Sequence, residues 1–246
     1  MMWNKIRPFI EISLAMLFWS ASFIWYKEAY LYLGPITLVM FRLITSSLFM
    51  FVLIAALKKL ERIKKKDLKY FFLLAFVEPL VYFLGESHGM MMVSSTVGSV
   101  IISTIPLFTP IAALLIYREK ISWIKLAGVS ISFAGVLIVL IGKGFQLIAP
   151  IEGIALMFIA VFAAVSHSII IVKLIPKYRS MTIILGQSIL GTLYFLPIFF
   201  LTELDEVARI HWNWDVIEPI IKLGIFPSSL SFVFYFLSFM TTISII

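Results

Sequence analysis

The sequence predicts an all-α, polytopic transmembrane helical bundle. Hydrophobic residues make up 62% of the 246 residues and charged residues only 13%, whereas soluble domains are about 45–50% apolar and about 25% charged. Eight blocks of mostly apolar residues follow one another, and each has the roughly 20 residues that a membrane-spanning helix needs. The blocks are continuous apolar runs, without the alternation typical of transmembrane β-strands of about ten residues. The bilayer is therefore the expected solvent of this fold.

The eight spans are expected at 8–26, 35–57, 68–88, 92–117, 122–141, 153–172, 181–201 and 216–240. Lys5 and Arg7 precede the first block as in a signal peptide. No small-residue cleavage site follows, however, and Trp19 and Trp25 lie within the apolar run. We therefore expect this segment to be retained as the first span.

The other spans are distinguished by the few residues in them that are not simply apolar. The second span carries Arg42, and the third carries Pro79, which predicts a local break in backbone hydrogen bonding. Small residues recur every four positions in the fourth and fifth spans, as for Gly128 and Ser132, and predict close helix packing. The sixth and seventh spans are apolar runs with His167 and Gln187. The eighth follows a loop with two tryptophans, as an aromatic belt would place them.

Basic residues alternate from loop to loop. Fifteen of the 20 lysines and arginines lie before the first span or within 58–69, 118–125 and 173–179, and the opposite side holds four. Loops rich in Lys and Arg face the cytoplasm. The charges therefore predict a multi-pass protein of the cell membrane with a cytoplasmic N-terminus. Topology and contact with anionic lipid explain the basic loop 58–69, without any nucleic acid.

An internal repeat with an offset near 145 residues is also predicted. Residues 20–27 and 166–173 both read Ser-x-Ser, four apolar residues and Lys, and 35–42 aligns with 180–187. The third span, from Leu74, then aligns with the eighth, from Leu223. A unit of five helices makes the second copy inverted, which is typical of transporters. We expect repeats at 1–146 and 147–246, the second lacking its last two helices.

Several short motifs resemble the drug/metabolite transporter superfamily, in its ten-helix EamA-type branch. They are Phe-Trp-Ser-Ala-Ser-Phe at 18–23 with Lys27, Phe41-Arg42, Pro-Leu-Phe-Thr-Pro at 106–110, Arg118-Glu119, Gly128 to Gly135, Gln187 with Gly191 and Pro197, and Leu-Gly-Ile-Phe at 223–226. Val165 stands where the family has a tryptophan, and 241–246 departs from its pattern. The resemblance implies inverted repeats and transport of small metabolites.

Ionisable groups inside a membrane cost roughly 2.5–3.5 kcal/mol at a helix centre and are functional candidates. Arg42 is expected to attract an anionic substrate, to pair with Glu78 or Glu86, or to reach the outer headgroups. Glu78, Tyr82 and Glu86 recur every four residues and predict one polar stripe on a cavity wall. Glu78 is the candidate for proton coupling, and Glu86 lies close enough to the outer surface to be simply solvated.

Four further residues complete the predicted substrate site. Trp19 is either a stacking wall or a packing residue, and His167 is either a ligand or a satisfied core histidine. Gln187 is the repeat equivalent of Arg42, and Tyr235 is the equivalent of Glu86. No cofactor or metal is expected, because the chain has no cysteine and only three histidines.

The sequence therefore predicts a secondary transporter, exporting or exchanging small metabolites by alternating access between the repeats. An amino acid or an amphipathic compound would suit the apolar and aromatic lining. No P-loop is present, and an intramembrane enzyme would need a nucleophile with its base, or a metal cluster. The alternative is a truncated, non-transporting fragment or an assembly-only membrane protein, for which a homodimer would supply the missing walls.

Overall fold

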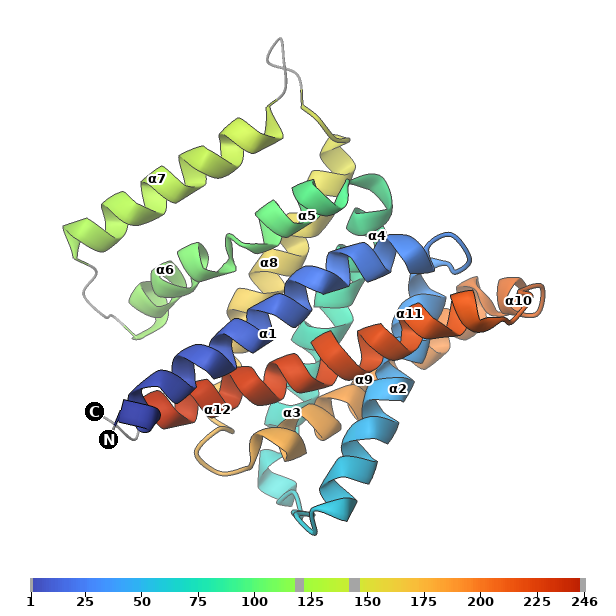
Figure 1. Ribbon diagram of the computed structural model, residues 1–246, viewed down its shortest axis with the longest axis horizontal. Coiled ribbons are helices and arrows are strands. Elements are labelled where there is room, and N and C mark those ends of the chain that lie inside the picture. Colours follow the sequence, from blue (N-terminus) through green and yellow to red (C-terminus); the bar gives the residue numbers. More distant parts are fainter. Residues whose placement is uncertain (1, 118–121, 142–146, 244–246) are drawn as a thin grey trace.

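The protein is an all-α, polytopic helical bundle (Figure 1). The computed structural model describes residues 2–117, 122–141 and 147–243. Its longer helices are α1 (Met2–Ala29), α2 (Pro35–Ala56), α6 (Ile105–Tyr117), α7 (Trp123–Leu140), α8 (Ile151–Ile171), α9 (Ser180–Thr202), α11 (Trp214–Ile225) and α12 (Ser231–Ile243). Shorter ones are η1 (Lys65–Asp67), α3 (Leu68–Ala75), η2 (Phe76–Val81), α4 (Tyr82–Met92), α5 (Ser95–Ile102), α10 (Leu204–Val207) and η4 (Phe226–Leu230).

The predicted spans correspond to these helices in order. Among the described residues, seven helical segments are long and apolar enough to cross a membrane, and α7 contributes a shorter apolar helix, Leu126–Leu140, at the fifth position. The third, fourth and eighth spans are each divided between successive helices. Arg118, Glu119, Lys120 and Lys143, which the charge and motif predictions used, lie outside the described residues, as does 244–246.

Two of the divided spans contain a π-helical turn at a proline. In η2, Glu78 has extended dihedral angles (φ −141°, ψ 116°), and Pro79 has no N–H to donate. In η4, Pro227 likewise leaves the carbonyl of Leu223 without its helical donor. The hydroxyl of Ser228 donates to this carbonyl at 2.8 Å, so the break is satisfied within the protein.

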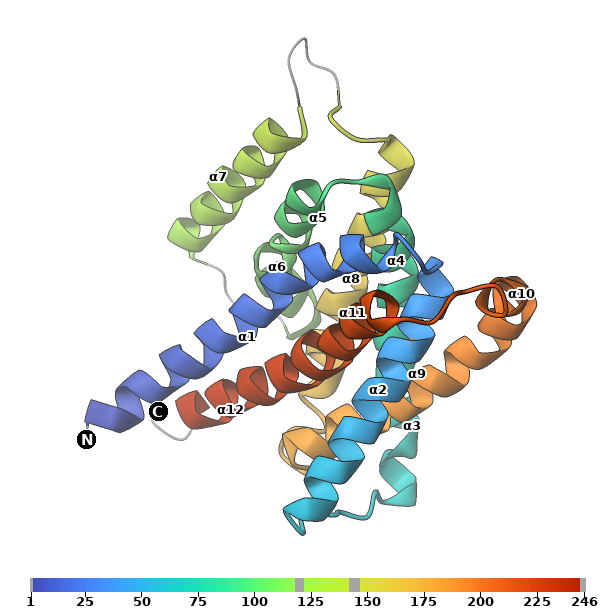
Figure 2. The ribbon, with the colours of Figure 1, turned by 45° about the vertical axis from the view of Figure 1, so that its right-hand side comes forward.

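The packing pairs helices that are distant in sequence. Helix α1 runs along α11 and α12, α8 runs along α4 and contacts η2, and α2 packs against α9 (Figures 1 and 2). Helices α4 and α8 approach closely, since a Cβ at Gly85 would lie 2.6 Å from the backbone oxygen of Leu156. These three contacts form the centre of the bundle and place the polar residues described below.

A carboxylate caps each end of the α2–α9 pair. Glu203, just after α9, accepts the first-turn N–H groups of α2 from Ile36 at 3.1 Å and Thr37 at 2.6 Å. Glu61, just after α2, accepts the N–H of Arg179 at 3.0 Å and the hydroxyl of Thr182 at 2.6 Å, at the start of α9. The two helices are therefore antiparallel and fastened to each other at both ends.

Helix α7 lies at the edge of the molecule (Figure 1). A Cβ at Gly128 or Gly135 would meet nothing within 4 Å, and Ser132 is exposed. The prediction that these small residues pack closely against another helix is therefore wrong for the described residues. Small size permits close packing but does not supply a partner, and here the residues face outward from a peripheral helix.

Candidate functional site

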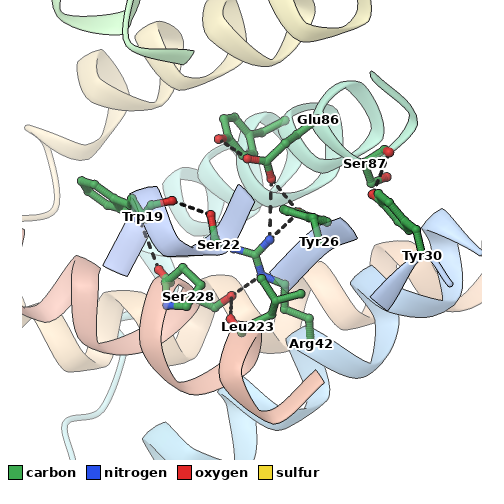
Figure 3. A network of polar contacts seen from close by, with 11 residues as sticks. Trp19, Ser22, Tyr26, Tyr30, Arg42, Glu86, Ser87, Leu223 and Ser228 are labelled. Atoms are coloured by element: carbon green, nitrogen blue, oxygen red, sulfur yellow. Dashed lines mark hydrogen bonds and ion pairs between the residues drawn. The ribbon is translucent and has the colours of Figure 1, made fainter. Parts of the chain in front are cut away.

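Arg42 of α2 lies at the centre of a buried polar network (Figure 3). Its Nη1 donates to Tyr26 Oη of α1 and lies 3.6 Å from Glu86 Oε2 of α4. Tyr26 Oη donates to Glu86 Oε2 at 2.6 Å, and Tyr82 Oη donates to Glu86 Oε1 at 2.8 Å. Arg42 and Glu86 are each 3% exposed. The network therefore pairs two buried charges and surrounds them with phenol groups.

The other edge of Arg42 faces the interruption in the eighth span. Its Nε donates to Ser228 Oγ of η4, and its guanidinium carbon lies 4.3 Å from the ring centroid of Phe83. Within the described part of the chain, Nη2 has no hydrogen bond. Arg42 thus links α1, α2, α4 and η4 and retains a donor that is not used.

Glu78, His167 and Gln187 form a second buried cluster. Glu78 Oε2 lies 3.5 Å from His167 Nδ1, and Gln187 Nε2 lies 2.9 Å from His167 Nε2. Gln187 Nε2 also donates to the backbone oxygen of Glu78 at 3.0 Å. Because this carbonyl belongs to the interrupted turn η2, Gln187 ties α9 to that turn.

A small cavity separates the two clusters. Members of both line it, namely Phe83 and Ser228 beside Arg42, and Glu78 and Gln187 from the second cluster. The other lining residues are Leu43, Pro79, Ile184, Ser188 and Phe232. Its volume is about 30 Å³, room for about two water molecules. A metabolite site usually needs roughly 300 Å³ or more, so the cavity as it stands is too small for a metabolite.

Trp19 and Tyr235 lie next to the cavity wall. Trp19 Nε1 donates to the backbone oxygen of Pro227 at 3.2 Å, another carbonyl of the interrupted turn. Its ring lies against Phe232 and Tyr235, with centroids 5.2 and 5.6 Å away. Tyr235 is partly buried and takes part in neither hydrogen-bonded cluster. Trp19 therefore braces η4, and Tyr235 packs behind it.

The structure decides between several alternatives that the sequence left open. Arg42 pairs with Glu86 rather than Glu78. Both side chains are buried, so the predictions that Arg42 reaches the headgroups and that Glu86 is solvated are wrong. The predicted single stripe is also wrong. Tyr82 and Glu86 face Arg42, but Glu78 faces His167, because the extended backbone at Glu78 interrupts the helical register.

Sequence reasoning missed Tyr26, Ser228 and a group of three hydroxyls. Ser46 of α2 lies 2.9 Å from Ser188 of α9 and 2.8 Å from Ser229 of η4, Oγ to Oγ. Tyr26 belongs to the motif before Lys27, but only the rotation of α1 shows that it bridges Arg42 and Glu86. Ser228 had a signal, since a hydroxyl directly after a membrane proline often satisfies a freed carbonyl.

No group of three or more His, Asp or Glu suited to a metal ion exists among the described residues. Two interrupted membrane helices that meet at buried polar groups are instead the usual architecture of a secondary transporter site. The fold and the site thus define the class of multi-pass membrane transporters.

Comparison with known proteins identifies the family. The EamA-like transporter family matches residues 9–141, more than half of the chain. An uncharacterized transporter of Archaeoglobus fulgidus is 30% identical over 94% of this chain and 81% of its own length. The uncharacterized transporter YdfC of Bacillus subtilis is 26% identical over 92% of this chain and 72% of its own. The chain belongs to the EamA-like transporter family, within the drug/metabolite transporter superfamily.

Proposed function

We propose that this chain is a secondary transporter that moves a small metabolite across the cell membrane by alternating access. The substrate would bind in the cavity between the Arg42 network and the Glu78 cluster. The observation that carries the proposal is that both interrupted turns, η2 and η4, meet at this cavity. Membrane transporters place substrate sites at such unwound segments, where backbone groups are available to a ligand.

Inverted repeats at 1–146 and 147–246 are part of this proposal. In an inverted pair, the first helix of each repeat is expected to pack on the third helix of the other. Helix α1 packs on the eighth span, and α8 packs on the third span. The interrupted turns lie at corresponding places, and Glu61 and Glu203 cap the second helix of the opposite repeat. The loop charges add a cytoplasmic N-terminus. Each feature favours the repeat independently of the sequence alignment.

The favoured substrate carries a carboxylate or another anionic group on an apolar body. Arg42 has an unused donor at Nη2, and a charge-assisted hydrogen bond from this nitrogen would hold a carboxylate. Leu43, Ile184 and Phe232 line the cavity with apolar surface. An amino acid or a small amphipathic acid fits this combination. The cavity must open before such a molecule enters, because its volume as it stands suits only water.

Glu78 is the proposed proton-coupling residue of an exporter or exchanger. It is a buried carboxyl group at the cavity, next to a histidine rather than an arginine or lysine. Protonation would remove its charge while the cavity changes sides, and release would restore it. We infer transport rather than catalysis as the activity, because the family and the named relatives are transporters.

Counterflow in proteoliposomes tests the proposal. Vesicles holding the purified chain and an unlabelled amino-acid mixture should accumulate a radiolabelled mixture from outside. Arg42→Gln and Arg42→Lys should both lower accumulation by about tenfold or more, since a lost charge-assisted hydrogen bond is worth about 1.5–3 kcal/mol. Lys58→Gln, which removes an exposed loop charge, should leave accumulation unchanged.

The same vesicles test proton coupling. A pH gradient should drive transport by the unchanged protein, and Glu78→Gln should abolish the response to the gradient while retaining counterflow. An unchanged gradient response in Glu78→Gln would remove Glu78 from the mechanism. A folded chain that transports nothing, alone or as a homodimer, would instead support the assembly-only alternative.

A further inference from the structure

Three lysine side chains converge on one tyrosine where the third and sixth spans meet. The Nζ atoms of Lys69, Lys173 and Lys177 lie 5.1, 5.2 and 5.7 Å from the ring centroid of Tyr70. We call these four residues the Tyr70 lysine cluster. Lys69 and Tyr70 belong to the start of α3, and the other two lysines follow α8. The cluster is therefore produced by the fold and not by a single run of basic residues.

Positive charge in the cluster is only partly compensated. Lys177 Nζ donates to Asp67 Oδ1 at 2.7 Å, and this hydrogen bond raises the pKa of Lys177 above its ordinary value. Tyr178 Oη donates to the other oxygen of Asp67 at 2.9 Å. Within the described residues, Lys69 and Lys173 form no ion pair with any carboxylate. Two exposed ammonium groups thus lie around an aromatic ring with no counter-ion from the protein.

Apolar surface continues directly from the cluster along α3 and into η2. Phe72, Leu73 and Phe76 follow Lys69 at helical spacing, and all three are between 46% and 48% exposed. The face therefore has cations at the end of a spanning segment and exposed hydrocarbon further into that segment. A free phosphate ion would use only the first part of this face, whereas a phospholipid would use both.

We propose that the Tyr70 lysine cluster binds the phosphate headgroup of an anionic phospholipid, whose acyl chains lie along Phe72 and Phe76. Lys69 and Lys173 supply the positive charge, and Lys177 remains committed to Asp67. Each lysine at the surface of an anionic leaflet adds to the binding of an anionic headgroup. This site is separate from the transport cavity, and the proposal does not depend on the transported substrate.

Native mass spectrometry of the purified full-length chain in neutral detergent tests the proposal. Phosphatidylglycerol and phosphatidylcholine with identical acyl chains would be titrated separately. The unchanged protein should bind phosphatidylglycerol more tightly, and Lys69→Gln/Lys173→Gln should weaken that binding by about tenfold or more. Lys69→Arg/Lys173→Arg should retain it. Thermal unfolding of each variant would confirm that it remains folded.

The matched control is Lys58→Gln/Lys59→Gln, which removes the same amount of charge from two lysines of the basic loop 58–69 that do not lie over the Tyr70 ring. Phosphatidylglycerol binding should be unchanged in this variant. An equal loss in both double variants would contradict the proposal, because diffuse loop charge would then explain the binding. Inorganic phosphate and a soluble short-chain phosphatidylglycerol would also be compared as competitors of the bound lipid. If phosphate displaces the lipid at the same concentration as the short-chain lipid, the apolar face contributes nothing and the proposal is overturned.

Discussion

At the scale of residues, the buried charge of Arg42 is balanced by groups from three helical segments, α1, α4 and η4. Glu86 supplies the opposite charge, Tyr26 bridges the two, Ser228 accepts from Nε, and Phe83 lies under the guanidinium. A buried ion pair gains little over an apolar pair, but removing one partner leaves the other charge uncompensated. Such a pair therefore specifies which helices lie together more than it adds stability.

A double-mutant cycle would measure this coupling. Glu86→Met should lower the free energy of unfolding by about 3 kcal/mol, because Arg42 would remain buried without its counter-charge. Arg42→Met should have a similar effect. The double variant Arg42→Met/Glu86→Met should lose clearly less than the sum of the two. Reversible unfolding in mixed detergent micelles gives the values, and strict additivity would show that the two charges are not coupled.

The sequence predicted the identity of the polar site residues better than their partners. Arg42, Glu86 and Gln187 are buried polar groups in apolar runs, so the cost of burial marks them without a structure. Their partners depend on helix rotation, which the apolar runs leave undetermined because lipid-facing and protein-facing residues are equally apolar. For this reason Tyr26 was missed and Glu78 was assigned to the wrong group.

At the scale of elements, prolines mark the interruptions but do not determine them. Pro79 and Pro227 lie in the π-helical turns, whereas Pro197 lies inside α9 without dividing it. At each of the two interrupted turns a side chain donates to a backbone carbonyl. Gln187 donates to the carbonyl of Glu78, and Ser228 donates to that of Leu223. The sequence therefore predicted the spans well, but their interruptions only in part.

The carboxylate caps of α2 and α9 are also testable as elements. Glu203→Ala and Glu61→Ala should each lower the free energy of unfolding by about 1 kcal/mol, the usual value of an N-terminal cap. Because the two caps lie at opposite ends of the helix pair, their effects should add in the double variant. Glu206→Ala, at an exposed residue near Glu203, is the control and should be neutral. Thermal unfolding in detergent would show these differences.

At the scale of the whole molecule, loop charges predicted an arrangement in which the basic loops share one side. The contacts of Glu61 with Arg179 and Thr182 place the loops after α2 and α8 together. On the other side of the bundle, Lys222 of α11 lies 3.9 Å from Glu28, near the end of α1. Which of these two sides faces the cytoplasm depends on how the chain is inserted in the membrane, and an experiment in cells measures it.

The absence of cysteine from the sequence makes this experiment direct. Single variants Lys59→Cys and Asn213→Cys would be expressed in bacterial cells and exposed to a membrane-impermeant maleimide. Cysteine at position 213 should react in intact cells, and cysteine at position 59 should react only after permeabilisation, since basic loops remain in the cytoplasm. The opposite pattern would reverse the predicted orientation, and the unchanged chain is the blank.

The fastening of α2 to α9 limits which motions the bundle can make. Sliding or splaying these two helices would pull a first-turn amide group away from Glu203 or Glu61. The remaining helices make no such contact at both ends with α2 or α9 among the described residues. A rearrangement that keeps both caps therefore moves α2 and α9 as one unit, and the other spans change position around them. Spectroscopic labels on α2 and α9 would then keep their separation, while the distance between labels on α1 and α8 would change.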